Sequence, residues 1–232
     1  MSRDDALADR VREVMHDLPR KQGRLARAVH LKGVFASWTK DTAAESLVSA
    51  VRAQVPTRGN GQVWYLDDEN HRPADLDLSQ LSRGRTAAVL PIWAQRAQGQ
   101  LLEELFDPAS YGWSSVIFIT EDLGATVGEH VDNEDVYTIQ LCGSKHWVID
   151  PPDLDWLRAR ALAGELARLN PSESWVRNRR EVVPFRCPRE FRVDAGDLLA
   201  MPAFSLHEVR ALGPRATIAF NVSICQEQDW TA

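Results

Sequence analysis

The sequence predicts a mainly β protein, a sandwich or small barrel that follows a helical and mixed N-terminal part. The first observation is a series of short β-prone segments in the second half of the chain, separated by Gly, Pro, Asp or Ser. The second is length, because 232 residues suffice for one large domain with a sizeable core. We therefore expect a single domain over 1–232, mixed over about 1–110 and barrel-forming over about 111–225.

The N-terminal part is expected to contain helices and short strands. Apolar residues recur at steps of three and four over 4–18, which is typical of an amphipathic helix. "AVHLKGVFASW" (28–38) predicts a short strand and a turn, and a second helix is expected over 42–51. Polar and turn-forming residues dominate 57–85, interrupted by a predicted strand at "QVWYL" (62–66).

The barrel core is expected to begin near residue 111. Its predicted strands are "SSVIFIT" (114–120), "VYTIQL" (136–141), "HWVI" (146–149), "EFRV" (190–193), "DLLAM" (197–201) and "ATIAFNVS" (216–223). Leucine and alanine recur at helical steps over roughly 153–169. We therefore predict one helix inserted between the strands of the barrel.

Composition argues against several classes of function. The formal charge of −6 disfavours a partner held by a broad basic surface, so no nucleic acid is expected. No run approaches about 18 consecutive apolar residues, so no membrane span is expected. The N-terminal "MSRDDALADRVREVMHDL" lacks the apolar core of a signal peptide and predicts a cytoplasmic protein. The cysteines have no CxxC spacing, so neither a disulfide framework nor a zinc cluster is expected.

His130 and Asp132 are the first residues that suggest chemistry. They lie two positions apart at the edge of a strand-like run, where alternate side chains point the same way. They can form a hydrogen-bonded pair or half of a metal site, and His207, near another predicted strand, is a candidate third ligand. Two imidazoles and one carboxylate on one face of an ion are typical of non-haem Fe(II) oxygenases. The simpler alternative is that each histidine is an ordinary surface or core residue.

Lys145 follows the turn after a predicted strand. Alternation places Lys145, Trp147 and Ile149 on one face of the returning strand. If that face is inward, the ammonium needs an anion or loses its proton. Lys145 is then an anchor for the far carboxylate of a small diacid, or else a hairpin-tip lysine whose head reaches water. The spacing leaves both alternatives open.

Three stretches together resemble the JmjC and cupin-like 2-oxoglutarate oxygenases: "HVDNEDVYTIQLCGSKHWVI" (130–149), "GDLLAMPAFSLHEV" (196–209) and "AFNVS" (219–223). The likeness is greatest to the branch of the bacterial ribosomal-protein hydroxylases and the asparaginyl hydroxylase of hypoxia signalling, and it covers about 111–223. It implies a double-stranded β-helix, which is a cupin or jelly-roll barrel, with flanking N-terminal helices and one inserted helix.

The resemblance also implies roles for individual residues. In that family the HxD pair and a distal histidine bind Fe(II), which makes His130, Asp132 and His207 the implied iron ligands and catalytic residues. A basic residue thirteen positions after the aspartate binds the C5 carboxylate of 2-oxoglutarate, and here it is Lys145 (132 + 13 = 145). Asn221 falls near an asparagine that lies beside the metal-bound cosubstrate.

The family often has a hydroxyl residue before the HxD pair that assists the lysine. Here Val127 occupies the expected position and Thr126 is one residue away, so Thr126 is the candidate. Thr120 and Thr138 are alternatives.

The implied activity is hydroxylation of an unactivated C–H bond with Fe(II), 2-oxoglutarate and O₂, giving succinate and CO₂ as coproducts. We expect an amino-acid, peptide or related small-molecule substrate. The chain ends nine residues after Ser223, so we expect neither the C-terminal dimerisation region nor the winged-helix module of the ribosomal hydroxylases. The alternatives are a protein side-chain hydroxylase, a cupin that uses metal without 2-oxoglutarate, and a non-catalytic metal-binding cupin module. A homodimer is left open.

Overall fold

The structure, a computed structural model, describes most of the predicted barrel and parts of the N-terminal half. The described residues are 10, 13–21, 24–39, 63–66, 71–74, 86–89, 111–120, 123–132, 134–153, 185–213 and 215–224. The predicted helices over 42–51 and 153–169 lie outside this set, apart from Asp153, which is not helical. Within it, no helix is long and apolar enough to cross a membrane.

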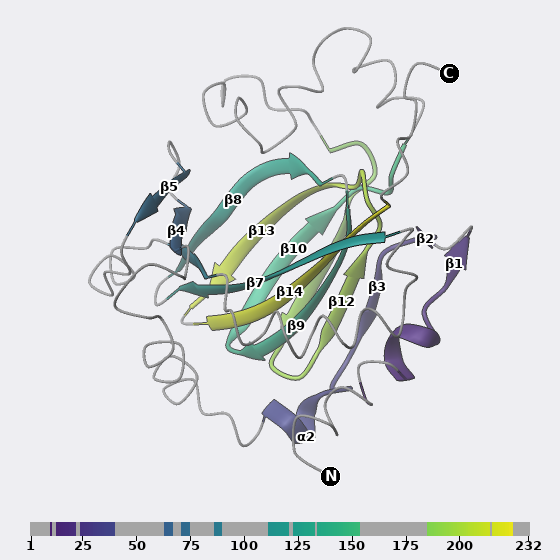
Figure 1. Cartoon of the computed structure of the whole chain (residues 1–232), viewed down its shortest axis with the longest axis horizontal. Helices are drawn as coiled ribbons and strands as arrows, with labels where there is room; N and C mark the ends of the chain where they lie inside the picture. Colours follow the sequence, from purple (N-terminus) through teal and green to yellow (C-terminus); the bar gives the residue numbers. More distant parts are fainter. Residues whose placement is uncertain are drawn as a thin grey trace, which may run out of the picture.

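Eight antiparallel strands form two facing sheets (Figure 1). They are β7 (Tyr111–Thr120), β8 (Leu123–Val131), β9 (Asp135–Cys142), β10 (Ser144–Ile149), β11 (Arg189–Asp194), β12 (Leu198–Met201), β13 (Leu206–Leu212) and β14 (Arg215–Ile224). The minor sheet has the order β11-β10-β13-β8, and the major sheet contains β12-β9-β14-β7. Successive strands pass repeatedly from one sheet to the other, so the barrel is a double-stranded β-helix. This confirms the predicted fold class.

The six predicted barrel strands are all present, and β8 and β13 were not among them. In the sequences of these two strands, glycine, glutamate, histidine or arginine interrupt the apolar residues, which weakens the local β signal. They form because β13 pairs with β8 on one side and with β10 on the other. Pairing with neighbouring strands, and not the local sequence, therefore determines that these two segments are strands.

The major sheet continues beyond the barrel at both edges. β3 (Val29–Leu31) adds to β12, and β6 (Thr86–Val89), β4 (Val63–Leu66) and β5 (His71–Ala74) add in that order beyond β7. The predicted strands at 28–38 and 62–66 are confirmed in β3 and β4. β5 lies in the polar stretch 57–85 and was not predicted as a strand; its proline is tolerated because β5 is an edge strand.

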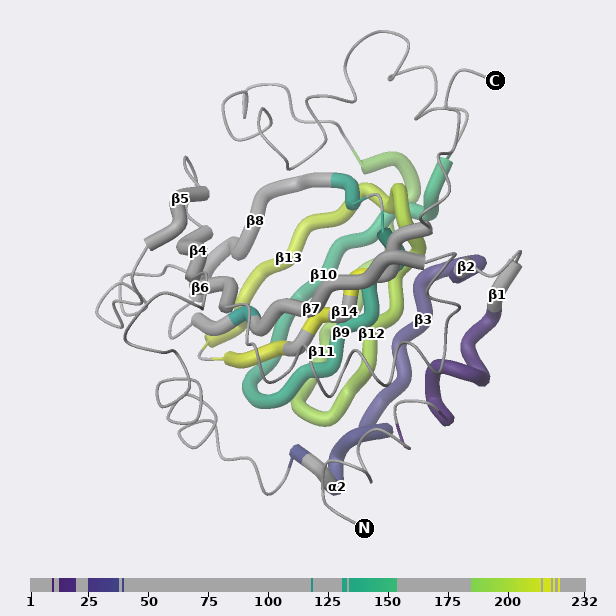
Figure 2. The backbone as a smooth tube through the Cα atoms, viewed as in Figure 1, coloured from purple at the N-terminus to yellow at the C-terminus, as the bar shows by residue number. Residues whose placement is uncertain are grey.

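The N-terminal segment packs against the outer edge of the major sheet, where its purple trace runs beside β3 (Figure 2). Residues 13–16 are helical, in agreement with part of the predicted helix, and a two-stranded sheet of β1 (Arg20–Lys21) and β2 (Arg24–Leu25) follows. α2 (Ala36–Thr39) replaces the turn expected at the end of 28–38. The helix begins after a turn in which Ala36 N donates a hydrogen bond to Gly33 O.

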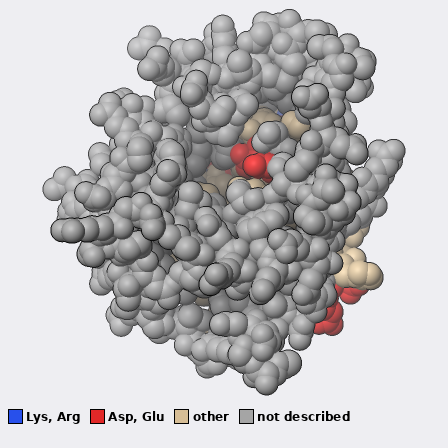
Figure 3. Space-filling model, in the orientation of Figure 1, with Lys and Arg blue, Asp and Glu red and all other residues tan. Residues whose placement is uncertain are grey.

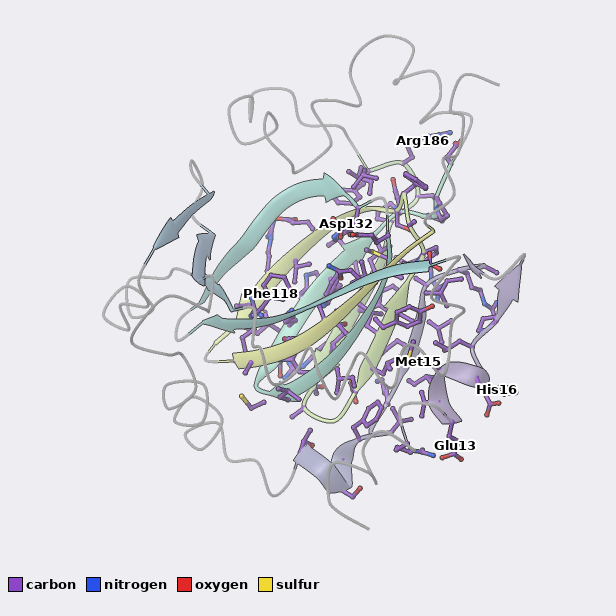
Figure 4. The ribbon with its side chains drawn as sticks, in the orientation of Figure 1. Glu13, Met15, His16, Phe118, Asp132 and Arg186 are labelled. Carbon is purple, nitrogen blue, oxygen red and sulfur yellow. The ribbon has the colours of Figure 1, made fainter. Side chains whose placement is uncertain are left out.

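The barrel core is formed by side chains of both sheets. It contains Val136, Trp147, Ile149, Phe191, Val193, Leu199, Met201, Val209 and Ala219, with Ala28 and Phe118 packed against it. Along β10 every second residue is buried, so the predicted inward face of Lys145, Trp147 and Ile149 is confirmed. Asp132 and Phe118 mark opposite ends of the interior (Figure 4). We call these ends the mouth, near Asp132, and the inner end, near Phe118.

The turn before β12 ties the N-terminal segment to the barrel. Asp197 accepts hydrogen bonds from Gly33 N at 2.7 Å and from Asp194 N at 3.0 Å, and its carboxylate lies 2.8 Å from His30 Nε2. Gly196 has a φ of +89°, and a Cβ there would meet Ala36 Cα at 2.7 Å. The Gly-Asp pair thus serves both a left-handed turn and a close approach of two backbones.

We predict that Gly196→Ala destabilises the protein more than Gly213→Ala. Both glycines have a positive φ, but nothing lies within 4 Å of the Cβ that an alanine at Gly213 would carry. Each variant should lose about 1–3 kcal/mol through backbone strain, and only Gly196→Ala adds an overpacking cost of about 1–3 kcal/mol. Urea unfolding measures both losses. Equal losses would show that the contact with Ala36 relaxes freely.

Candidate functional site

His207 and Asp132 meet at the mouth of the barrel. His207 is on β13 and is 2% exposed, and Asp132 follows directly after β8. The distance from His207 Nε2 to Asp132 Oδ2 is 3.6 Å, which is too long for a good hydrogen bond. Two ligands that each lie ~2.1 Å from a shared ion are ~3.0–3.4 Å apart. The pair is therefore close to the separation that a shared cation requires.

Two contacts fix the orientation of His207. Its Nδ1 lies 3.0 Å from the carbonyl oxygen of Ser205, and its ring stacks on Trp147 with the centroids 5.7 Å apart. When Nδ1 donates to that carbonyl, Nε2 keeps its lone pair and faces Asp132. Histidines that bind metals usually donate their second ring N–H in this way.

Asp135 holds the loop that leads to His207. Its carboxylate accepts hydrogen bonds from Ala203 N at 2.8 Å and from Leu25 N at 2.9 Å. In the same loop Phe204 has a φ of +64° and donates its N–H to Asp132 O at 2.7 Å. The backbones that carry the two site residues are thus joined directly, and Asp135 positions them.

The mouth is acidic. Burial, and then the neighbouring Asp132, raise the pKa of Glu134 to about 7. In the space-filling view, acidic side chains lie at the floor of a hollow, in the region where Figure 4 labels Asp132 (Figure 3). Two neighbouring carboxyl groups, with the imidazole of His207 beside Asp132, form a place that favours a cation.

Lys145 lies inside the barrel and is 3% exposed, so its head does not reach water at the hairpin tip. Its Nζ lies 5.3 Å from the ring centroids of both Phe118 and Trp147. No hydrogen bond or ion pair to Lys145 occurs within the described part of the chain. Burial, and then the charge of Arg215, hold the pKa of Lys145 well below its usual range. The interior therefore holds a buried lysine for which the described residues supply no anion.

The remaining predicted site residues are placed only in part. The backbone register pairs His130 with His207, but the side chains of His130 and Thr126 lie outside the described residues. No group of three potential metal ligands is found among the described side chains, and His130 is not one of them. Asn221 is half-buried on β14 opposite Val136 of the core. The iron-ligand and cosubstrate roles stay predictions.

Of the suggested partners of Lys145, only Thr138 has a described side chain. It donates to Leu199 O at 3.1 Å and is therefore engaged by β12. The sequence interpretation missed Asp135 and the buried Arg215. Each begins a strand, and for Arg215 the alternation with Thr217, Ala219 and Asn221 was a usable signal of an inward face.

The fold and the mouth define the class first: a double-stranded β-helix with a histidine–carboxylate pair at its open end. The model of the JmjC domain matches residues 95–230, which is more than half of the chain. The chain therefore belongs to the JmjC-domain family. A search of curated proteins gave no match.

Solved structures of the ribosomal oxygenase YcfD from Escherichia coli have a similar fold. One superposes with a TM-score of 0.57 at 16% identity over 90% of this chain and 50% of that chain. A complex with cobalt and 2-oxoglutarate gives a TM-score of 0.56 at 18% identity, covering 87% and 49%. A complex with cobalt and succinic acid gives 0.59 at 17%, covering 90% and 50%. The present chain thus spans about half the length of these proteins.

We predict that Asp135→Asn weakens both the fold and cation binding at the mouth. One amide oxygen cannot replace two carboxylate oxygens that each accept a buried backbone N–H, so stability should fall by about 1–3 kcal/mol. The loop before His207 then loses its tether. Urea unfolding and a Co(II) titration followed by visible absorption measure the two effects. The exposed Asp17→Asn is the control and should change neither; unaltered Co(II) affinity in Asp135→Asn would contradict the positioning role.

We predict that Lys145→Met stabilises the ligand-free protein and that this gain shrinks as pH rises. The folded-state pKa of Lys145 is lowered, so the unfolded chain keeps this proton at pH values where the folded chain has lost it. Wild-type stability therefore rises with pH through that window, up to the ordinary lysine value of 10.5. Denaturant unfolding across pH measures the difference, with the exposed Lys32→Met as control. A difference that is constant with pH would count against a strained ammonium.

Proposed function

We propose that this protein is an Fe(II)- and 2-oxoglutarate-dependent oxygenase that oxidises an unactivated C–H bond. One observation carries the proposal: a JmjC barrel has a histidine–aspartate pair at its mouth and a buried lysine for which the described residues supply no anion. A non-catalytic module has no need for either feature. A metal enzyme that uses no diacid explains the pair but leaves Lys145 without a partner among the described residues.

The mouth fits a divalent ion of the first transition series. His207 Nε2 is presented by the bond from Nδ1 to Ser205 O, and Asp132 supplies a carboxylate that is 20% exposed. With His130, which the register places across from His207, the donors would be two imidazoles and one carboxylate. That ligand set leaves positions free for other ligands and suits Fe(II).

The interior fits a dicarboxylate because it contains donors without acceptors. Within the part of the chain that the structure describes, Trp147 Nε1 and two nitrogens of Arg215 are buried with no hydrogen-bond partner. Lys145 adds an ammonium among aromatic rings. Buried donors are normally paired, so a molecule rich in acceptors is the natural complement. 2-Oxoglutarate offers a carboxylate for the lysine and a 2-oxo acid group for a metal at the mouth.

The chemistry supplied by Fe(II), 2-oxoglutarate and O₂ is oxidation of a C–H bond, with succinate and CO₂ as coproducts. The protein's own residues bind and orient. Lys145 would hold the far carboxylate, and an arriving anion restores the pKa of its Nζ so that the proton stays there. Trp147 and Phe118 keep water away from this ion pair and thereby strengthen it.

For the substrate we propose an amino acid, a peptide or a related small molecule. A protein side chain is the second candidate, favoured by the likeness to proteins named ribosomal oxygenases. Succinate release separates the two when purified protein is offered free amino acids, short peptides or ribosomal proteins. Turnover with ribosomal proteins alone would overturn the first proposal.

The direct test is anaerobic addition of Fe(II) and 2-oxoglutarate to the purified protein. We predict the weak visible charge-transfer band of an iron–2-oxo acid chelate in wild type, and its loss in His207→Ala and His130→Ala. His146→Ala is a matched control, because His146 points away from the core toward Glu190 and should leave the band unchanged. Lys145→Ala should bind iron but need far more 2-oxoglutarate. A wild-type spectrum indifferent to 2-oxoglutarate would reject the cosubstrate.

A further inference from the structure

Arg215, at the start of β14, is a second buried cation in the barrel. It is 2% exposed, and burial lowers the pKa of its guanidinium to about 9. Its Nη1 has one long contact, 3.5 Å from Thr217 Oγ1, whereas Nε and Nη2 have no hydrogen-bond partner among the residues that the structure describes. A buried guanidinium with unsatisfied donors is strongly unfavourable, so it needs an explanation.

Among the described residues, the neighbouring polar groups do not supply an explanation. Thr217 Oγ1 donates to Gln140 Oε1 at 2.7 Å, and Gln140 Nε2 donates to Cys142 O at 2.7 Å. These hydrogen bonds occupy the nearby described acceptors, so two nitrogens of Arg215 have no acceptor among the described residues. An arginine retained only for packing would be expected to bind a carbonyl or carboxylate of its own chain.

Arg215 borders the same interior as Lys145. Thr217, which the guanidinium contacts, is the cross-strand partner of Phe118, and Lys145 Nζ lies over the ring of Phe118. Directly paired residues of neighbouring strands have their side chains on one face. The charge of Arg215 also lowers the pKa of Lys145, as expected for two like charges in one dry interior.

We propose that Arg215 binds the same distal carboxylate as Lys145, donating from Nε and Nη2, so that two cations hold one end of the cosubstrate. This inference rests on the proposed function, because it takes the anion to be 2-oxoglutarate. One carboxylate has two oxygens and accepts from a guanidinium fork and an ammonium together. The arrangement makes the distal carboxylate a strict requirement, since a 2-oxo acid without it would leave both buried charges unpaired.

The test compares two ligands that differ only in the distal carboxylate. Co(II)-loaded protein is titrated with 2-oxoglutarate and with 2-oxopentanoate, and binding is followed by calorimetry and by thermal unfolding, with no turnover involved. We expect Arg215→Met to weaken binding of 2-oxoglutarate by about 10²-fold and to leave binding of 2-oxopentanoate unchanged or improved. Arg215→Lys should fall between wild type and Arg215→Met. The exposed Arg192→Met is the matched control and should bind both ligands as wild type does.

Ligand-free stability separates a binding role from a structural one. If Arg215 awaits an anion, Arg215→Met should unfold at the same temperature as wild type or higher, and gain less from added 2-oxoglutarate. If Arg215 is structural, Arg215→Met should be less stable and lose both ligands equally, which overturns the inference. The milder Arg215→Lys gives the same comparison if the methionine variant does not fold.

The outcomes also distinguish this inference from the proposed function. If wild type binds 2-oxoglutarate and Arg215→Met binds it equally well, Arg215 is not a ligand of the carboxylate and the proposed function stands. If Co(II)-loaded wild type binds neither oxo acid, both the proposed function and this inference are wrong. Competition by chloride for the wild-type site, with no selectivity for 2-oxoglutarate, would show a general anion site and also overturn it.

Discussion

The pairing of β13 with two neighbours is the constraint on which the site depends. β13 lies between β8 and β10, so its residue His207 is opposite His130 on one side and opposite Ile149 on the other. The same register places Asp132 beside the loop that enters β13, where Phe204 N bonds to Asp132 O. A slip of one residue would turn every side chain of β13 to the opposite face and would separate His207 from Asp132.

Two aspartates hold this register by accepting backbone N–H groups from remote segments. Asp197 fixes the start of β12 to the segment around Gly33, and Asp135 fixes the loop after β12 to the segment around Leu25. Both carboxylates are buried, and their bonds to backbone donors compensate for the lost hydration. The N-terminal segment is therefore part of the scaffold that positions the mouth.

Charge is separated along the interior of the barrel. Asp132 and Glu134 make the mouth acidic, whereas Lys145 and Arg215 make the inner end basic. This arrangement is unfavourable for the protein alone, because burial disfavours the charged forms of Glu134, Lys145 and Arg215, as their shifted pKa values show. Under the proposed function, a cation at the mouth and an anion inside would offset the cost at both ends. Such sites sacrifice stability of the free protein for binding, as functional sites commonly do.

The fold class, six barrel strands and the inward face of β10 could be read from local patterns, because apolar alternation and turn residues act over a few positions. β8 and β13 could not, since their sequences are poor in such signals and long-range pairing forms them. The same limit applied to Lys145, whose spacing allowed both an exposed and a buried head. It applied to Asp135 as well, because nothing in the neighbouring residues distinguishes a surface carboxylate from a buried one. For Arg215 the alternation along β14 indicated an inward face, but only the closed barrel shows that the cation is buried there.

The sequence by itself determined which residue types are available to the site and roughly where strands run. Only the tertiary structure decided that His207 lies 3.6 Å from Asp132, that Lys145 is buried, and that Arg215 shares its interior. The physical reason is that burial and contact between remote side chains are set by the pairing and closure of the sheets. Those properties belong to the whole barrel and to no single stretch of the chain.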